Sequence, residues 1–251
     1  MQDYSKAFAR VYNTHWSVFA TRVAPLIRGY YESLPLGSTK RSVLDLCCGA
    51  GHLAAHFLDQ GYQVVGIDLS EHMLTYARAN TERYVKSGQA KFLKADVTDF
   101  SIDDRVGLAV STYDSLNHLE SEQALSNCFR CVRAVCDGPF IFDLNTRKGL
   151  NNWNGTQVNE SDPNAFVVSR GKYDGESDKA WLTVVGFVRE PDGSYQRFDE
   201  SVYNTVFRLE RVRELLLEAG WKNVHFARIQ EPAVPLEGPE VEFRVLVVAR
   251  P

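Results

Sequence analysis

The sequence predicts an α/β fold built on a seven-stranded, mostly parallel sheet with an antiparallel last strand. Three observations lead to this prediction. Between residues 36 and 149, short apolar runs alternate with helix-like stretches, as expected for parallel strands joined by crossover helices. The alternation then stops, and three β-type runs follow without a helix between them. Near residue 206 it resumes with one helix and two further apolar runs.

The alternating elements can be taken in chain order. An aromatic-rich helical stretch covers residues 4–34 and ends before Pro35. Five strands are expected at Ser42–Cys47, Gln63–Ile67, Ala90–Lys94, Val106–Val110 and Pro139–Leu144. Helices are expected at Gly51–Gln60, from about Ser70, and over about 121–135. We expect one domain, with a helical segment at 1–35 and a core at 36–149 and 206–251.

Residues 150–205 are predicted to form an antiparallel β insertion after the fifth strand. Residues 151–164 are loop-like, and the turn sequence at 190–193 joins the second and third β-type runs. These runs are Ala165–Tyr173, Lys179–Arg189 and Ser194–Phe207. After a helix at Leu209–Ala219, we expect Asn223–Ile229 and Val241–Ala249 to pair antiparallel at one edge of the main sheet.

Composition excludes several classes of partner. A chain of 251 residues with 44% hydrophobic content buries a full core. Its net charge of -4 leaves no excess of basic residues to neutralise a phosphate backbone, so we expect no nucleic acid partner. No stretch approaches the ~18 apolar residues that span a bilayer, so no membrane partner is expected. The five cysteines form no evenly paired framework and residues 1–30 lack a signal-peptide core, which predicts a cytoplasmic protein.

The most informative segment is Val43–His52, where an apolar strand runs into two glycines at a helix start. Gly49 and Gly51 let the backbone turn tightly and approach a ligand. The same glycines fit the dinucleotide fingerprint G-x-G-x-x-A, so an NAD-dependent oxidoreductase is an alternative. Asp45 favours another ligand, because a pyrophosphate prefers amides without a nearby anion. A carboxylate there suits the ammonium and sulfonium charges of S-adenosylmethionine.

Two further acids follow the next two strands. Asp68 ends the second strand, seventeen positions beyond Gly51, where an acid accepts hydrogen bonds from both ribose hydroxyls. Asp96 follows the third strand, where it is expected to accept from an adenine amino group while Val97 offers a backbone donor. Open α/β sheets bind ligands beyond the carboxyl ends of their strands. The row of acids therefore marks the expected nucleoside site.

With these motifs in place, the sequence resembles the class I S-adenosylmethionine-dependent methyltransferases. The resemblance covers 42–149 and 206–251 in element order, and its layout is similar to small-molecule N-methyltransferases acting on glycine or amino sugars. One departure is the pair Cys47-Cys48, where the family usually has a single Cys or a Gly. The resemblance implies a Rossmann-like core and S-adenosylmethionine as cofactor, with S-adenosylhomocysteine as product. It also implies in-line methyl transfer to a small-molecule acceptor, with nitrogen as the expected acceptor atom and oxygen or carbon as alternatives.

The resemblance also implies site residues. In the family, the loop after the fourth strand faces the transferring methyl group, which makes Tyr113 and His118 the candidate catalytic residues. Tyr113, Asn117 and Asn145 are the candidate acceptor contacts. The N-terminal helical segment is expected to fold over the cofactor as a lid. The expected cofactor contacts are Tyr12, Trp16, Asp45, Cys47, Gly49, Gly51, Asp68, Leu69, Met73, Asp96, Val97 and Ser111.

Other expectations concern the pocket wall, metals and assembly. Aromatic residues of the insertion are candidates for the acceptor wall, namely Trp181, Phe187, Tyr195, Phe198 and Tyr203. No metal site is expected, because His52 and His56 share a helix face but find no third ligand there. The chain is expected to be a monomer or a homodimer. A protein that binds S-adenosylmethionine without turning it over is a further alternative.

Overall fold

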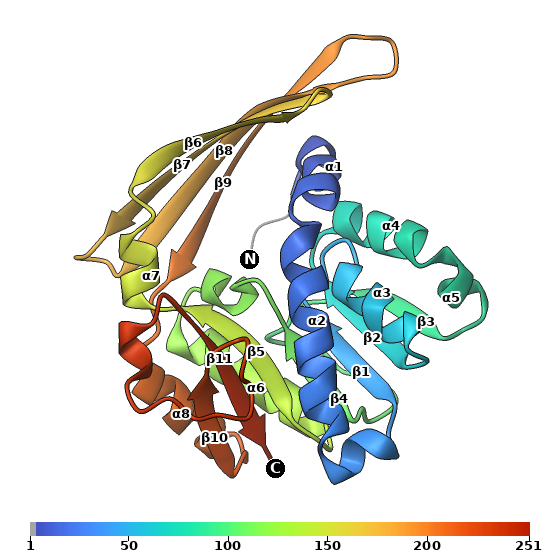
Figure 1. Ribbon diagram of the computed structural model, residues 1–251, viewed down its shortest axis with the longest axis vertical. Helices are drawn as coiled ribbons and strands as arrows, with labels where there is room; N and C mark the ends of the chain where they lie inside the picture. Colours follow the sequence, from blue (N-terminus) through green and yellow to red (C-terminus); the bar gives the residue numbers. More distant parts are fainter. Residues whose placement is uncertain (1–3) are drawn as a thin grey trace.

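The computed structural model describes residues 4–251, with side chains described at all of these except 159–161. Its main sheet has seven strands in the order β10-β11-β5-β4-β1-β2-β3, as Figure 1 shows. They are β1 (Ser42–Leu46), β2 (Gln63–Asp68), β3 (Ala90–Lys94), β4 (Leu108–Ser111), β5 (Phe140–Asn145), β10 (Asn223–Ala227) and β11 (Arg244–Arg250). Strand β11 runs antiparallel to both β5 and β10. The predicted α/β fold, including its antiparallel last strand, is confirmed.

Helices cover both faces of this sheet. The helices of the main body are α2 (Ser17–Glu32), α3 (His52–Asp59), α4 (Glu71–Asn80), α5 (Glu82–Lys86), α6 (Glu122–Val135) and α8 (Leu209–Glu218). One buried cluster joins α2, α3 and α4 to the sheet, and a second joins α6 and α8 to it. Along β1, Val43 belongs to the first cluster and Leu44 to the second, because successive side chains of a strand point to opposite faces.

The helical stretch expected over residues 4–34 consists of two helices. Helix α1 (Lys6–His15) begins at Ser5, whose side chain accepts from the Phe8 amide. Trp16 leaves the helical conformation, with φ -106° and ψ 10°, before α2 begins. Beyond this break, α1 packs against residues of a second sheet, since Phe8 and Val11 share a buried cluster with Val184 and Phe198.

The second sheet has four antiparallel strands in the order β6-β7-β8-β9. They are β6 (Gly155–Asp162), β7 (Ala165–Asp174), β8 (Lys179–Arg189) and β9 (Tyr195–Thr205), preceded by the short helix α7 (Arg147–Asn151). Figure 1 shows this inserted sheet extending from the core like an arm. The expectation of a loop over 151–164 was wrong. Strand β6 is an edge strand with exposed side chains at Thr156–Val158, so it lacks the apolar alternation that marks a strand.

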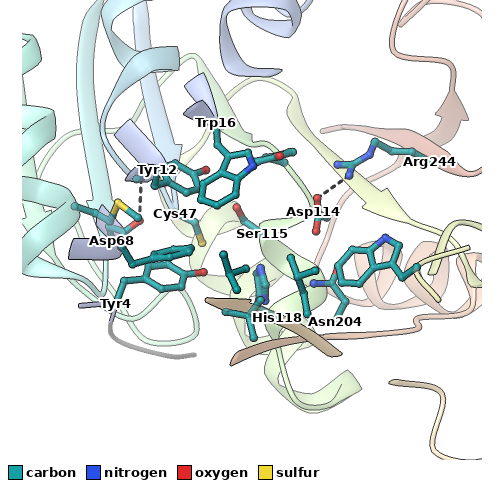
Figure 2. A pocket seen from close by; sticks show the side chains of 18 residues that line it. Tyr4, Tyr12, Trp16, Cys47, Asp68, Asp114, Ser115, His118, Asn204 and Arg244 are labelled. Atoms are coloured by element: carbon teal, nitrogen blue, oxygen red, sulfur yellow. Dashed lines mark hydrogen bonds and ion pairs between the residues drawn. The ribbon is translucent and has the colours of Figure 1, made fainter. Parts of the chain in front are cut away.

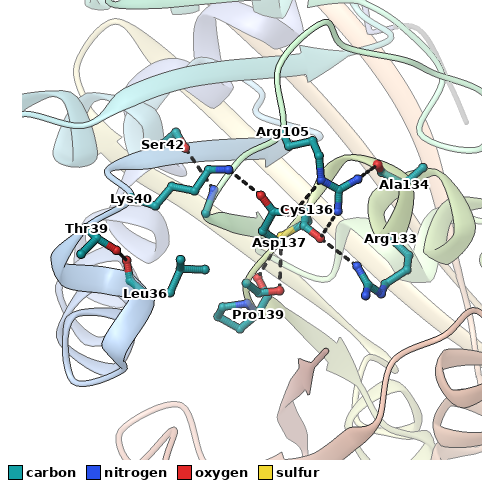
Figure 3. A network of polar contacts seen from close by, with 12 residues as sticks. Leu36, Thr39, Lys40, Ser42, Arg105, Arg133, Ala134, Cys136, Asp137 and Pro139 are labelled. Atoms are coloured by element: carbon teal, nitrogen blue, oxygen red, sulfur yellow. Dashed lines mark hydrogen bonds and ion pairs between the residues drawn. The ribbon is translucent and has the colours of Figure 1, made fainter.

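A polar network holds the amino ends of β4 and β5 together, as Figure 3 shows. Asp137 accepts from Lys40 Nζ and Arg105 Nε, both at 2.5 Å. Ser42 Oγ accepts from the Gly107 amide at 3.0 Å. The remaining short helices are η1 (Pro35–Ser38), η2 (Ser115–His118) and η3 (Pro239–Val241). No helix within residues 4–251 is long and apolar enough to cross a bilayer.

Candidate functional site

A cavity of about 280 Å³ lies where α1, the carboxyl edge of the main sheet and the inserted sheet meet (Figure 2). Cys47 and Gly49 follow β1, Asp68 ends β2, and Tyr113 follows β4. A second cavity of about 20 Å³ includes Asp45 and shares Cys47 and Tyr113 with the first. The cavities therefore lie where open α/β sheets bind their ligands.

The loop after β1 has an unusual backbone that its glycines make possible. Gly49 and Gly51 have φ of +52° and +76°, a region that residues with a Cβ rarely adopt. The Gly49 amide donates to Asp68 Oδ2 at 2.9 Å, which ties the loop to the end of β2. A Cβ on Gly51 would lie 3.0 Å from Ala77 Cα in α4. Gly51 thus allows close packing with α4, and the structure does not place it on the cavity wall.

Asp45 is a buried carboxyl group at the bottom of this loop. Burial, with the nearby charge of Asp68, raises the pKa of Asp45 to about 8. Its Oδ2 has no hydrogen-bond partner within residues 4–251. A buried carboxyl oxygen without a partner is costly, and a cationic ligand group beside it would supply that partner and favour the ionised form. The residues therefore fit a ligand with an ammonium group, such as S-adenosylmethionine.

The loop after β4 holds two residues in the left-handed region, Tyr113 with φ 68° and Asp114 with φ 49°. Such a conformation costs free energy and persists only where surrounding contacts impose it. Here the contacts come from Asp143 of β5, which accepts from the Tyr113 amide at 2.6 Å and the Asp114 amide at 2.9 Å. Arg244 of β11 pairs with Asp143 and, at 2.7 Å, with Asp114. Asp143 and Arg244 therefore position the loop.

Tyr113 is confined by its neighbours. Its ring stacks on Phe19 of α2 with centroids 4.8 Å apart, and the Arg244 guanidinium lies 5.7 Å from its centroid. Burial, followed by the charge of Asp114, raises the pKa of Tyr113 to about 12. The phenol is therefore protonated at neutral pH and can donate a hydrogen bond, but it cannot serve as a base.

His118 ends the short helix η2 and lines the cavity. Its Nδ1 lies 2.7 Å from the carbonyl oxygen of Tyr203 in β9. Because a carbonyl only accepts, Nδ1 carries a proton and the Nε2 of the neutral ring keeps its lone pair. His118 is thus oriented by the inserted sheet, and its Nε2 suits a proton acceptor.

Asn117 and Asn145 do not line either cavity. The Asn117 side chain accepts from the Asn145 amide and donates to the Asn145 and Thr205 carbonyls, at 2.9, 3.2 and 2.9 Å. Asn145 Nδ2 donates to Asn204 Oδ1 at 3.4 Å. Both asparagines therefore connect the main sheet to β9 from behind the cavity, and Asn204 is the amide that the structure places on its wall.

The expected cofactor contacts divide into two groups. Tyr12, Trp16, Cys47, Gly49, Asp68 and Met73 line the larger cavity, and Asp45 lines the smaller one. Gly51, Leu69, Asp96, Val97 and Ser111 line neither. Asp96 is exposed, and its Oδ1 accepts from the amide and hydroxyl of Thr98, both at 2.8 Å. Its side chain thus stabilises its own turn two residues beyond β3.

The expected aromatic wall was wrong. Trp181, Phe187 and Tyr195 are exposed, Phe198 packs against Phe8 of α1, and none of the five lines the cavity. The wall from the inserted sheet is Leu182, Val184, Val202 and Asn204. Periodicity along a strand separates its two faces but does not say which faces inward.

Sequence reasoning also missed several lining residues outside that sheet, which are Tyr4, Phe8, Asp114, Ser115, Trp153 and Arg244. Asp114 and Ser115 lie within the polar loop that the sequence identified. Arg244 lies in the last strand, and only tertiary structure brings it to this loop.

Comparison with known proteins agrees with this geometry. Residues 43–135 match a family model described as a methyltransferase domain. A putative methyltransferase of Bacillus subtilis, YqeM, is 26% identical over 188 residues, covering 73% of this chain and 74% of its own. The dTDP-3-amino-3,6-dideoxy-alpha-D-glucopyranose N,N-dimethyltransferase of Streptomyces fradiae is also 26% identical, over 71% of this chain and 69% of its own.

Solved structures share the fold. An S-adenosylmethionine-dependent methyltransferase from Clostridium acetobutylicum superposes with a TM-score of 0.77 and 20% identity, covering 97% of each chain. CalS10 of Micromonospora echinaspora, an amino pentose methyltransferase with S-adenosylmethionine bound, has a TM-score of 0.66 and 15% identity over 100% of this chain and 99% of its own. These comparisons favour a methyltransferase over an NAD-dependent oxidoreductase.

Proposed function

Because this chain belongs to the class I S-adenosylmethionine-dependent methyltransferases, we propose that it methylates an amine nitrogen of a small molecule. The observation that carries the choice of nitrogen is that the cavity is lined by both a histidine, His118, and a carboxylate, Asp114. A carboxylate attracts the ammonium form of an amine, and the Nε2 of His118 accepts the proton that the amine must lose.

The cofactor is proposed to lie along the carboxyl ends of β1 and β2. Asp68 lines the cavity with both oxygens already accepting one amide each, at 2.9 Å. A carboxylate oxygen has a second lone pair, so ribose hydroxyls can donate to the same group. Met73 lies on the adenosine side, and Tyr12 and Trp16 of the α1 segment cover the site. Asp45 receives the ammonium group, which gives its Oδ2 a partner.

S-adenosylmethionine supplies a methyl group bonded to a positively charged sulfur. The nitrogen lone pair of the acceptor forms the new C–N bond as the C–S bond breaks, and the electrons of that bond stay on sulfur. The proton released from nitrogen passes to His118 Nε2 and then to solvent. Since the leaving group is already activated, the main task of the protein is to orient the reactants, and the loop that Asp143 fixes serves this purpose.

The names of similar proteins support a nitrogen acceptor. The Streptomyces fradiae relative is an N,N-dimethyltransferase and CalS10 acts on an amino pentose. A small-molecule acceptor agrees with a cavity near the lower end of the range for ligand pockets. A cytoplasmic location is part of the proposal, because five cysteines without an evenly paired framework suit a reducing compartment.

Calorimetric titration with S-adenosylhomocysteine, and with NADH in parallel, tests the cofactor assignment. We expect micromolar binding of S-adenosylhomocysteine alone. Methyl transfer to a panel of amines, phenols and carboxylic acids, followed by mass spectrometry, then tests the acceptor. Products confined to phenols or acids would contradict the nitrogen assignment, and binding of NADH alone would contradict the cofactor.

A further inference from the structure

The strongest unexplained feature of the cavity is the Asn204 side chain. Asn204 lies near the end of β9, is 0% exposed and lines the cavity, where Figure 2 shows it among the side chains around the hollow. Its Oδ1 accepts from Asn145 Nδ2, which directs its own Nδ2 away from that contact. Nδ2 has no hydrogen-bond partner within residues 4–251.

Leaving a buried amide donor unpaired costs about 1–3 kcal/mol. The orientation of Asn204 is set from behind, because Asn117 fixes the backbone of Asn145 through its amide and carbonyl groups. The donor is therefore preorganised toward the cavity, where a ligand, or a water that a ligand displaces, can supply the missing acceptor. Figure 2 shows Asn204 near His118, away from Asp68 and Cys47 at the ends of β2 and β1.

Charge further limits what this wall can bind. Among the described lining residues, Arg244 is the one arginine or lysine, and it already pairs with Asp114 and Asp143. Asp68 and Asp114 are the lining carboxylates on the main cavity. No lysine or arginine of the described wall is left to pair with a phosphate or carboxylate. Around Asn204 the wall is apolar, formed by Leu182, Val184 and Val202.

We infer that Asn204 selects the acceptor: a compact amine with an apolar body that presents a neutral hydrogen-bond acceptor, such as a carbonyl, ether or sulfonyl oxygen, to Nδ2. The inference rests on the proposed function and narrows it. Acceptors that bring a carboxylate or a diphosphate into this cavity are selected against, although the S. fradiae relative is named for a dTDP-sugar.

Three matched probes test this inference on the full chain saturated with S-adenosylhomocysteine. They are 4-(methylsulfonyl)benzylamine, which has a neutral acceptor, 4-isopropylbenzylamine, which has a branched apolar group without one, and 4-(aminomethyl)benzoate, which is anionic. By calorimetry we expect the sulfone to bind about three- to tenfold more tightly than the isopropyl compound, the range for one neutral hydrogen bond. The carboxylate is expected to bind most weakly.

Two variants identify the residue responsible. In Asn204→Leu the preference for the sulfone over the isopropyl compound should fall to about one. Asn204→Asp keeps an oxygen that accepts from Asn145, but a second carboxylate oxygen takes the place of the Nδ2 donor. In this variant the isopropyl compound should bind more tightly than the sulfone. Ser201→Ala changes an exposed residue of the same strand and should retain the wild-type preference. All three variants should bind S-adenosylhomocysteine as the wild type does.

Several results would overturn the inference. They are equal binding of the sulfone and isopropyl probes to the wild type, no binding of any of the three, a preference that survives in Asn204→Leu, or tightest binding by the carboxylate. In each of these cases S-adenosylhomocysteine binding still supports the proposed function. Failure to bind S-adenosylhomocysteine would instead reject the proposed function and the inference together.

Discussion

Asp45 and Asp68 lie at the ends of neighbouring strands, and their different surroundings give them different tasks. Both Asp68 oxygens accept backbone amides, so this carboxylate also stabilises the ligand-binding loops. Asp45 Oδ2 lacks such a partner and its pKa is raised to about 8. The sequence identified both acids and their position. It did not show their burial, which depends on packing of the α1 and α2 segments over the loop.

The raised pKa of Asp45 predicts a pH-dependent cofactor affinity. Below about pH 8 the free protein carries a neutral Asp45, whereas an ammonium group binds best to the ionised form. Affinity for S-adenosylhomocysteine should therefore rise from pH 6 to pH 8, by at most about tenfold per pH unit, and level off above. Calorimetry at four pH values measures it. Asp45→Asn is the control, because any pH dependence that remains in this variant comes from the amino group of the ligand. If the affinities of the wild type and of Asp45→Asn changed with pH in the same way, the contact between Asp45 and the ammonium group would be contradicted.

Removal of the second acid should weaken cofactor binding directly. For Asp68→Ala we expect a loss of about 1.5–3 kcal/mol in binding of S-adenosylhomocysteine, the range for hydrogen bonds to a charged group. Because the Gly49 and Ser70 amides also lose their acceptor, thermal unfolding must be measured in parallel. Asp68→Asn keeps one carbonyl and should show an intermediate loss. Unchanged affinity in both variants would show that the ribose lies elsewhere.

At the level of elements, the core of the fold followed from the sequence and the insertion only partly did. Strands β1, β2, β4 and β5 are mostly buried apolar runs, so their pattern is distinctive. The polar edge strand β6 and the break at Trp16 have no such signal. The pairing of Arg244 with Asp114 joins residues 130 positions apart, and no local pattern reveals it. The part of the site built from strand ends was therefore predictable, and the part built across elements was not.

The contact between β5 and β11 supports a stability prediction. Arg244→Met leaves the fully buried Asp143 without its cation, and breaking a buried pair costs about 3–5 kcal/mol. Since the Arg244 side chain is 22% exposed, we expect the lower end, about 3 kcal/mol, in urea unfolding. Arg228→Met removes a more exposed pair with Glu242 and should lower the free energy of unfolding much less, because surface ion pairs contribute little. Equal losses in the two variants would contradict the role given to Arg244.

Across the whole molecule, α1 connects the two sheets. The Ser5 amide donates to Glu200 Oε1 of β9 at 3.0 Å, and Arg10 pairs with Glu190 at 3.4 Å. At the other end, the Asn13 carbonyl accepts from His52 Nε2 at 3.1 Å. Phe8 and Tyr12 of α1 line the cavity. A ligand inside the cavity and the contacts at the two ends of α1 therefore both stabilise the position of α1 over the cavity.

Cofactor binding should accordingly slow hydrogen exchange in α1. With S-adenosylhomocysteine at one hundred times its dissociation constant, amides of residues 6–15 that exchange by opening of the site should slow by up to about a hundredfold. Mass spectrometry of peptides resolves this, and α8, on the far side of the sheet, serves as the internal reference. Equal protection of α8 and α1 would indicate global stabilisation instead of closure by α1.

One consequence of β9 concerns how such enzymes diversify and how they can be engineered. This strand supplies Val202 and Asn204 to the cavity, while its Tyr203 and Thr205 carbonyls orient His118 and Asn117. The inserted sheet is therefore not a module that can be exchanged freely. A chimera that imports this sheet from a relative would change acceptor preference and the histidine tautomer in one step. Libraries that vary only the side chains of β9 that face the cavity would change acceptor preference and leave the backbone carbonyls that orient His118 and Asn117 in place.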